Sequence, residues 1–301
     1  PLELLVLNAE QVDDQRAILF ATGHLERLSP RLVPPQHPIA ILKQSPESSR
    51  KAAASGGVWF ADVFRVQRRF LRSVHLERDF ADADALDGYV ITPPVSQGFE
   101  RLIAGLAPKS GHRAWRVTGD YGTGKSSFAL ALARLLCGGT YPVPQRLRKA
   151  VDFGRLGLET KPELLPVLVT GAREPLGTAL LRAMANALEE TCTRGKRPQE
   201  VERLRTAADA CTRQLPSDAL VIELVRDAVR YVRESDKASG ILIILDEMGK
   251  FLEYASLYPE RQDVYLLQGL AEAAARSGDA PLFVVGILHQ GFQAYAERLS
   301  N

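Results

Sequence analysis

Cysteine, long apolar runs and net charge are all scarce in this sequence. Its three cysteines, Cys137, Cys192 and Cys211, are far apart and form neither a Cys-x-x-Cys pair nor a Cys/His group. That spacing offers no metal-ligand pattern and predicts small buried side chains in a reducing compartment. Because there is also no run of eighteen apolar residues and no basic-then-apolar leader, we expect a cytoplasmic protein with no membrane partner.

The charges nearly cancel. Lys and Arg together number 38 and Asp and Glu 36, which leaves a formal charge of +2. The field of the whole molecule therefore neither requires nor excludes a nucleic-acid partner, which would have to bind a local basic patch. One candidate patch is the arginine stripe from Arg65 to Arg72 on a predicted amphipathic helix. It is either a solvated helix face or a phosphate contact.

The 301 residues suffice for one large or two modest domains, and 46% hydrophobic residues allow a core of normal size. Residues 1–57 form a poorly defined, mixed N-terminal region, rich in proline and then in Ser, Ala and Gly. Residues 58–110 read as a helical linker, and residues 111–301 as the main domain, with a helical insert at 197–236. Since the chain opens at Pro1 rather than Met, we interpret it as a processed or excised piece.

From Ala114 onward, short apolar runs alternate with long amphipathic segments, a pattern typical of an α/β fold with a mainly parallel sheet. The predicted strands are Ala114–Thr118, Leu164–Thr170, Ile241–Leu245 and Pro281–Leu288. The predicted helices between and after them are Lys125–Leu136, Pro175–Cys192, Arg197–Gln214, Ser217–Glu234 and Gln262–Arg276.

A glycine-rich motif follows the first of these strands. The segment GDYGTGKS, Gly119 to Ser126, fits the pattern G-x-x-x-x-G-K-S/T and opens a predicted helix. Its glycines let successive backbone N–H groups point at phosphate oxygens, and the helix N-terminus adds partial positive charge. Lys125 is expected to neutralise the β- and γ-phosphates, and Ser126 to ligate Mg²⁺. The predicted nucleotide-binding residues are Gly119, Asp120, Tyr121, Gly122, Thr123, Gly124, Lys125, Ser126 and Ser127.

A second motif ends the buried strand ILIIL with two acids. Asp246 is predicted to lie at the carboxyl edge of the sheet and to bind Mg²⁺, mostly through water. Glu247 is then the candidate base that polarises the attacking water. An acid directly after the aspartate favours a hydrolase that uses its own glutamate, whereas a kinase would also need an acceptor site, of which the sequence shows no sign.

Polar residues end the other strands. Thr170 ends the strand that follows the glycine-rich helix, and His289 with Gln290 follows the last strand. His289 is predicted to contact the γ-phosphate or the attacking water, and is otherwise a cap or surface residue. Arg173 is a candidate for sensing or stabilising transferred charge, in its own subunit or toward a neighbour. No N/T-K-x-D segment follows the motif, so ATP with Mg²⁺ is favoured over GTP.

This order of strands and motifs resembles the additional-strand, catalytic-glutamate branch of P-loop ATPases, which includes the AAA+ and STAND groups. The segments Gly119–Leu136, Ile241–Tyr254 and Val284–Leu299 are similar to large ATPases of bacterial phage-defence systems. The resemblance implies a three-layer P-loop NTPase core with Lys125, Glu247 and His289 as catalytic residues. It also places Tyr89, Val90 and Ile91 near the adenine.

By the same resemblance, the chain stops before the fifth strand and the helical lid that these ATPases carry. The resemblance implies a homo-oligomer that uses ATP hydrolysis for conformational change in antiviral defence or nucleic-acid processing, with an effector protein as a possible partner. The alternative is a STAND-like binding switch, in which ATP locks one conformation and turnover is slow or absent.

Overall fold

The computed structural model describes residues 5–7, 74–108, 110–137, 143–192, 197–212, 214–258 and 263–289. All of them belong to one compact unit. Most of the N-terminal region at 1–57 and the arginine stripe from Arg65 to Arg72 lie outside the described residues. Those predictions therefore stay predictions.

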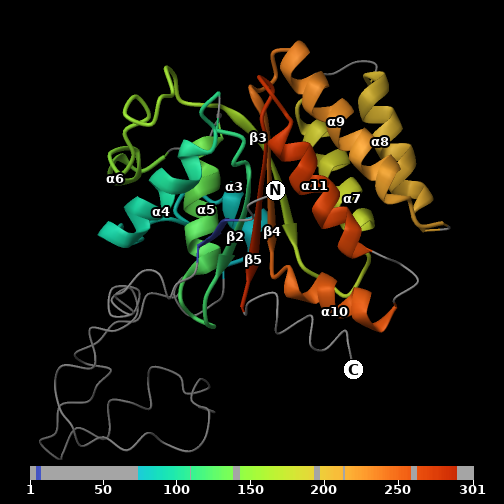
Figure 1. Ribbon diagram of the computed structural model, residues 1–301, viewed down its shortest axis with the longest axis horizontal. Coiled ribbons are helices and arrows are strands. Elements are labelled where there is room, and N and C mark those ends of the chain that lie inside the picture. Colours follow the sequence, from blue (N-terminus) through green and yellow to red (C-terminus); the bar gives the residue numbers. More distant parts are fainter. Residues whose placement is uncertain are drawn as a thin grey trace, which may run out of the picture. The chain divides into compact units, whose positions relative to one another are not determined.

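A single five-stranded sheet, with every strand pair parallel, forms the centre of the unit (Figure 1). The strand order is β1-β2-β5-β4-β3, so the last strand in sequence lies between β2 and β4. The strands are β1 (Leu5–Leu7), β2 (Ala114–Thr118), β3 (Leu164–Thr170), β4 (Gly240–Asp246) and β5 (Leu282–Leu288). This confirms the α/β class and the parallel sheet.

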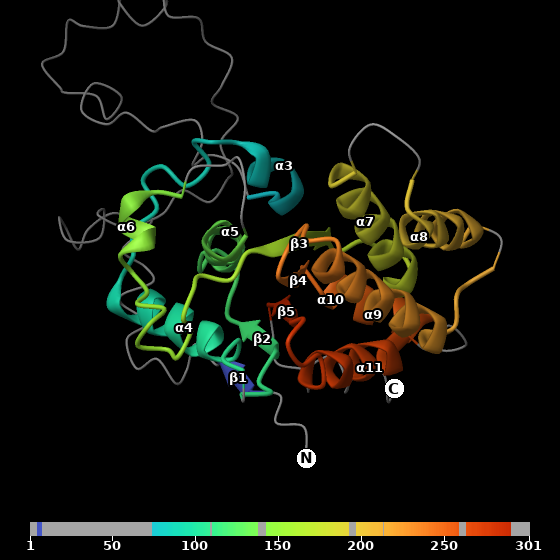
Figure 2. The same ribbon diagram turned by 90° about the horizontal axis from the view of Figure 1, so that it is seen from above.

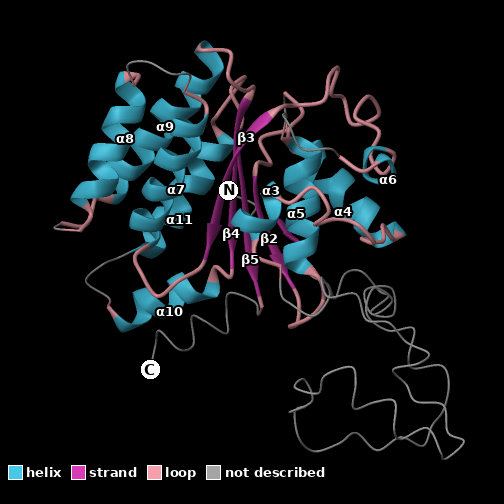
Figure 3. Cartoon of the chain, turned by 180° about the vertical axis from the view of Figure 1, so that it is seen from behind, coloured by secondary structure: helices cyan, strands magenta, loops and turns pink. Residues whose placement is uncertain are grey.

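Helices cover both faces of the sheet, which gives three layers (Figure 2). One face packs against α3 (Leu76–Ala81), α4 (Pro93–Ala104), α5 (Lys125–Leu136) and α6 (Gln145–Arg148). The other packs against α7 (Leu176–Glu190), α9 (Asp218–Glu234), α10 (Gly249–Leu257) and α11 (Asp263–Ala275). Helix α8 (Gln199–Ala210) lies mainly on α7 and α9, outside that layer (Figure 3).

Strand β4 shows why the sheet is central. All seven of its residues are buried, and consecutive side chains point to opposite faces. Ile241, Ile243 and Leu245 join the cluster beneath α7, α9 and α11, whereas Leu242 and Ile244 join the cluster beneath α4 and α5. An uninterrupted apolar run is what a strand covered on both faces requires.

Residues 74–108 pack into the same unit. Pro93 is the first residue of α4 and Thr92 its N-cap, a place where the fixed φ of proline suits the first helical turn. The helix ends at Ala104, and the backbone of the next residue, Gly105, passes so close to the His112 carbonyl that a Cβ there would lie 1.9 Å from its oxygen. Within the described part of the chain, no helix has the length and apolar character needed to cross a bilayer.

Candidate functional site

The carboxyl ends of four strands meet at one edge of the sheet. In the strand register Thr118 lies beside Leu288 and Thr170 beside Asp246, so the loops that follow these residues begin at the same level. The carboxyl edge of an open parallel sheet is where ligands of such folds bind. The residues that the sequence predicts to act together are therefore brought to one place.

The glycine-rich loop, defined as Gly119–Gly124, joins β2 to α5 at this edge. Gly122 and Gly124 have φ angles of +78° and +82°, in the left-handed region that side-chain-bearing residues rarely adopt. A Cβ on either would meet no atom within 4 Å, so glycine is needed for the backbone turn rather than for space. Gly124 is also the N-cap of α5 and offers no side chain to the first-turn N–H groups of that helix.

The Lys125 side chain folds back onto the glycine-rich loop. Its Nζ donates hydrogen bonds of 2.6 Å to the carbonyl oxygens of Gly119 and Asp120. Burial lowers the pKa of Lys125, while the charges of Asp246 and Asp120 act in the opposite direction. The two loop carbonyls thus hold the ammonium group against the loop. Other oxygen acceptors can replace these carbonyls.

Ser126, in the first turn of α5, faces Asp246 at the end of β4. Asp246 is only 3% exposed, and burial raises the pKa of its carboxylate. The nearby Ser126 hydroxyl and the hydrogen bond from the Glu247 N–H partly oppose that shift. A hydroxyl beside a buried carboxylate is an oxygen pair that suits Mg²⁺. Ser127, the next residue, is partly buried.

Glu247 has a strained backbone with a φ of +49°. Such a conformation costs a residue with a side chain on the order of 1 kcal/mol and persists only where its surroundings enforce it. Two neighbours do so here: the Met248 N–H donates to the Ile287 carbonyl of β5, and Gly171 lies against the Glu247 carbonyl. A Cβ on Gly171 would lie 2.2 Å from that oxygen.

The carboxylate of Glu247 forms an ion pair with Lys250, three residues later in the first turn of α10. Both side chains are part-exposed, at 35% and 47%. Lys250 was not among the residues predicted for the site. The i, i+3 spacing of Glu247 and Lys250 would have indicated this ion pair if a helix had been predicted directly after the acids. The sequence pattern did not predict α10.

His289 lies at the end of β5 with its imidazole stacked on the phenol ring of Tyr121 from the glycine-rich loop. The ring centroids are 3.8 Å apart and the planes differ by 20°. Burial and the nearby charge of Lys125 lower the pKa of His289, while Glu247 and Asp246 oppose that shift. The structure thus places His289 beside the other predicted site residues. Gln290 lies outside the described residues.

The loop after β3 borders the site as well. The backbone N–H of Thr170 donates to the carboxylate of Glu77 in α3 at 2.9 Å, a contact that no sequence pattern predicts. Farther along, Arg182 donates two hydrogen bonds to Glu174. Between these two anchors Arg173 is exposed and makes no hydrogen bond or ion pair with any described residue.

The three residues predicted near adenine differ in accessibility. Tyr89 is packed against the cluster around α4 and α5, and burial raises its pKa. Ile91 is partly buried in the same cluster, whereas Val90 is 56% exposed. Of the three, Val90 presents the most surface to a ligand.

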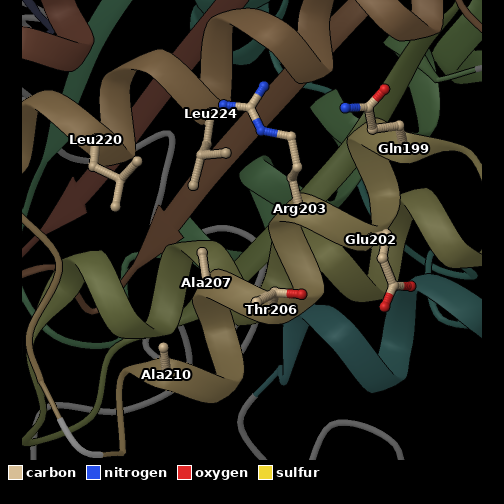
Figure 4. Close-up of a pocket in the computed structure, with 8 residues that line it drawn as sticks. All are labelled: Gln199, Glu202, Arg203, Thr206, Ala207, Ala210, Leu220 and Leu224. Atoms are coloured by element: carbon tan, nitrogen blue, oxygen red, sulfur yellow. The ribbon is translucent and has the colours of Figure 1, made fainter.

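A hollow of about 330 Å³ lies away from this edge, in the outer helical layer between α8 and α9. Figure 4 shows Arg203 and Glu202 among its lining residues, together with Ala207, Ala210, Leu220 and Leu224. Arg203 is engaged by Glu223 and Asp227 of α9. None of the predicted site residues lines it. The described residues also contain no group of three or more His, Cys, Asp and Glu that could hold a metal ion.

Comparisons of the chain with protein-family models, with curated proteins and with solved structures give no match. The function must therefore be inferred from the residues and their geometry.

Proposed function

We propose that this chain binds Mg²⁺ and ATP at the carboxyl edge of its sheet and hydrolyses ATP to ADP and phosphate. The observation that carries the proposal is the closeness of Ser126 to Asp246, near enough for the Ser126 hydroxyl to lower the pKa of the Asp246 carboxylate. It pairs the residue after the lysine of a phosphate-loop motif with the acid at the end of a buried strand, which is the pair that holds Mg²⁺ in P-loop NTPases.

The chemistry of the loop fits a triphosphate. The left-handed glycines and the uncapped N-terminus of α5 leave backbone N–H groups for phosphate oxygens. Without nucleotide, Lys125 donates to two backbone carbonyl oxygens. Phosphate oxygens would be stronger acceptors for its ammonium group because they are charged. Ser126 and Asp246 would hold Mg²⁺.

The residues divide the reaction between them. Mg²⁺, when bound, supplies positive charge to the phosphate oxygens. Lys125 and the loop N–H groups bind and orient the phosphates. Asp246 and Ser126 would hold the ion beside them. Glu247 accepts the proton of the attacking water, and His289 orients the water or the terminal phosphate.

The test is nucleotide binding by calorimetry and phosphate release by the wild-type chain, with Mg²⁺ and with a chelator. Lys125→Met should weaken ATP binding by at least about tenfold, because it removes a charge-assisted contact to phosphate. Lys149→Met, an exposed lysine after α6, is the matched control and should bind as the wild type does. Equal binding by the two variants would refute the proposed site.

A second function, a binding switch with slow or no turnover, is favoured by one observation. The candidate base Glu247 is engaged by Lys250 and is held in a strained backbone conformation. Such a switch would bind ATP tightly and show one round of binding in stopped-flow measurements. It would release no phosphate at steady state.

The resemblance to P-loop ATPases of the AAA+ and STAND group extends the proposal to biology. We propose a homo-oligomer that couples ATP turnover to conformational change in antiviral defence or nucleic-acid processing, with an effector protein or nucleic acid as partner. The exposed Arg173 is suited to reach a neighbouring subunit. Light scattering with and without a slowly hydrolysed ATP analogue tests the assembly, and Arg173→Ala tests the arginine.

A further inference from the structure

The stacked pair Tyr121 and His289 links two elements that are distant in sequence, the glycine-rich loop and the end of β5. The Tyr121 side chain is 79% exposed, so no core packing holds its ring in place. Its ring contact is with the imidazole, at a centroid distance of 3.8 Å and a nearly parallel angle. The two rings are stacked, and an aromatic contact contributes beyond the area that it buries.

The imidazole of His289 lacks the usual support. The orientation of a functional histidine is normally fixed by a hydrogen bond at the ring nitrogen that does not face the ligand. Here Nδ1 is buried and has no hydrogen-bond partner among the described residues. Among the described residues, the stack on Tyr121 is the contact that can fix the plane of the ring.

We propose that Tyr121 is the positioning residue of His289: its ring holds the imidazole plane, so that the conformation of the glycine-rich loop sets the orientation of His289. The kinetic part of this inference rests on the proposed function. The structural part does not, because it concerns the nucleotide-free chain.

The loop conformation is itself tied to the phosphate-binding groups. Asp120, the neighbour of Tyr121, accepts hydrogen bonds from Lys125 Nζ and from the Thr123 hydroxyl through its carbonyl oxygen. When Lys125 turns toward phosphate, that carbonyl loses its charged donor and keeps only the bonds from Thr123, so the loop around Tyr121 is held less tightly. The stack then transmits occupancy of the loop to the end of β5.

The structural test is the NMR spectrum of the nucleotide-free chain with ¹³C-labelled histidine at fixed pH. The His289 C–H resonance is identified by its loss in His289→Ala. A stacked imidazole is shielded by the ring current of its partner, so Tyr121→Ala should move this resonance downfield, whereas Tyr121→Phe should keep it close to the wild-type position. The matched control is Tyr265→Ala, an exposed tyrosine of α11. An unchanged His289 resonance in Tyr121→Ala would overturn the inference.

The kinetic test separates kcat from KM. Tyr121→Ala should lower kcat by about two- to tenfold, the size of an aromatic pair, with little change in KM. Tyr121→Phe should recover most of that loss. The double variant Tyr121→Ala/His289→Ala should have the same kcat as His289→Ala, because both substitutions remove the same function, that of a correctly oriented His289.

Two results would overturn the kinetic part. One is a double variant whose loss of kcat is the sum of the two single losses. The other is a rise in KM of Tyr121→Ala with kcat unchanged, which would make Tyr121 a binding residue. If the wild-type chain hydrolyses no ATP, the proposed function fails, and the NMR arm still decides whether Tyr121 holds His289. Thermal unfolding of each variant shows that it is folded; the exposure of Tyr121 makes a folding defect from its truncation small.

Discussion

The two halves of the site are built differently. The residues proposed to bind ATP and Mg²⁺, Lys125, Ser126 and Asp246, are called the binding half. Lys125 is 8% and Asp246 3% exposed, and Ser126 is partly buried. The residues proposed to hydrolyse ATP, Glu247 and His289, are called the hydrolytic half. Both are part-exposed, and each contacts a partner that can separate from it, the Lys250 ammonium and the Tyr121 ring respectively. Groups that hold charge benefit from burial and fixed geometry. Groups that move a proton need access to water and freedom to engage it.

The strongest test of this division is Glu247→Gln. The amide keeps the size of the side chain but cannot accept a proton from water, so kcat should fall by about 100-fold or more, as general-base removal does. ATP affinity, set by the binding half, should change little. Steady-state phosphate release and calorimetry measure the two quantities. If Glu247→Gln hydrolyses ATP at the parental rate, Glu247 is not the base and the hydrolytic half is wrongly assigned.

The Asp246→Asn variant separates two effects of the Asp246 carboxylate, its proposed binding of Mg²⁺ and its effect on the stability of the fold. Burial raises the pKa of Asp246 above its ordinary value of 3.8, so the folded chain holds the proton more tightly than the unfolded chain. Its contribution to folding is therefore fully present below pH 3.8 and is lost as the pH rises through the folded-state pKa. At neutral pH, without nucleotide or Mg²⁺, the asparagine variant should unfold about 2–4 °C higher than the wild type, for a gain of about 1 kcal/mol.

Thermal unfolding between about pH 4 and pH 7 checks the sign: the advantage of Asp246→Asn should grow with pH, in the direction that linkage requires. The same variant should lose the dependence of ATP binding on Mg²⁺. Asp209→Asn, an exposed aspartate of α8, is the control and should show neither effect. A variant that is less stable than the wild type at every pH would show that the carboxylate supports the fold.

The smallest expected effect belongs to Lys250. Its ion pair with Glu247 is part-exposed, and such pairs contribute about 0.2–1 kcal/mol, so opening the pair costs little. Lys250→Met should free the carboxylate and raise kcat by about two- to fivefold without a change in KM. Lys250→Arg should stay near the wild-type rate, as should Lys237→Met, an exposed lysine that follows α9. A fall in kcat would mean that the lysine supports the base instead of restraining it.

Much of the local structure was predictable. The bounds of β2, β3 and α5 agree with the sequence prediction to the residue, and β4 is one residue longer at each end. These elements have strong local signals: a glycine-rich turn, an apolar run of strand length, or helical spacing over several turns. Helices α6 and α10 were missed because both are short, and α10 starts at Gly249 without a side-chain N-cap.

The contacts of the site were less predictable. The sequence indicated that Gly119–Ser126 and Asp246 act together, and the structure brings them to one edge. It gave no indication that Glu77 of α3 accepts a hydrogen bond from Thr170, or that Tyr121 stacks on His289. Both contacts join segments that are far apart in the chain, and neither pattern of residue types is distinctive enough to pair them.

The sequence by itself determined the turn and the strand on which the site is built. Gly122 and Gly124 are glycines at positions with φ near +80°, which other residues avoid, and Ile241–Leu245 is apolar because it is covered on both faces. Only the tertiary structure decided that β5 lies between β2 and β4, so that His289 ends beside the glycine-rich loop. The physical reason is that strand order depends on how helices pack on the two faces of the whole sheet, whereas turn and strand formation depend on neighbouring residues.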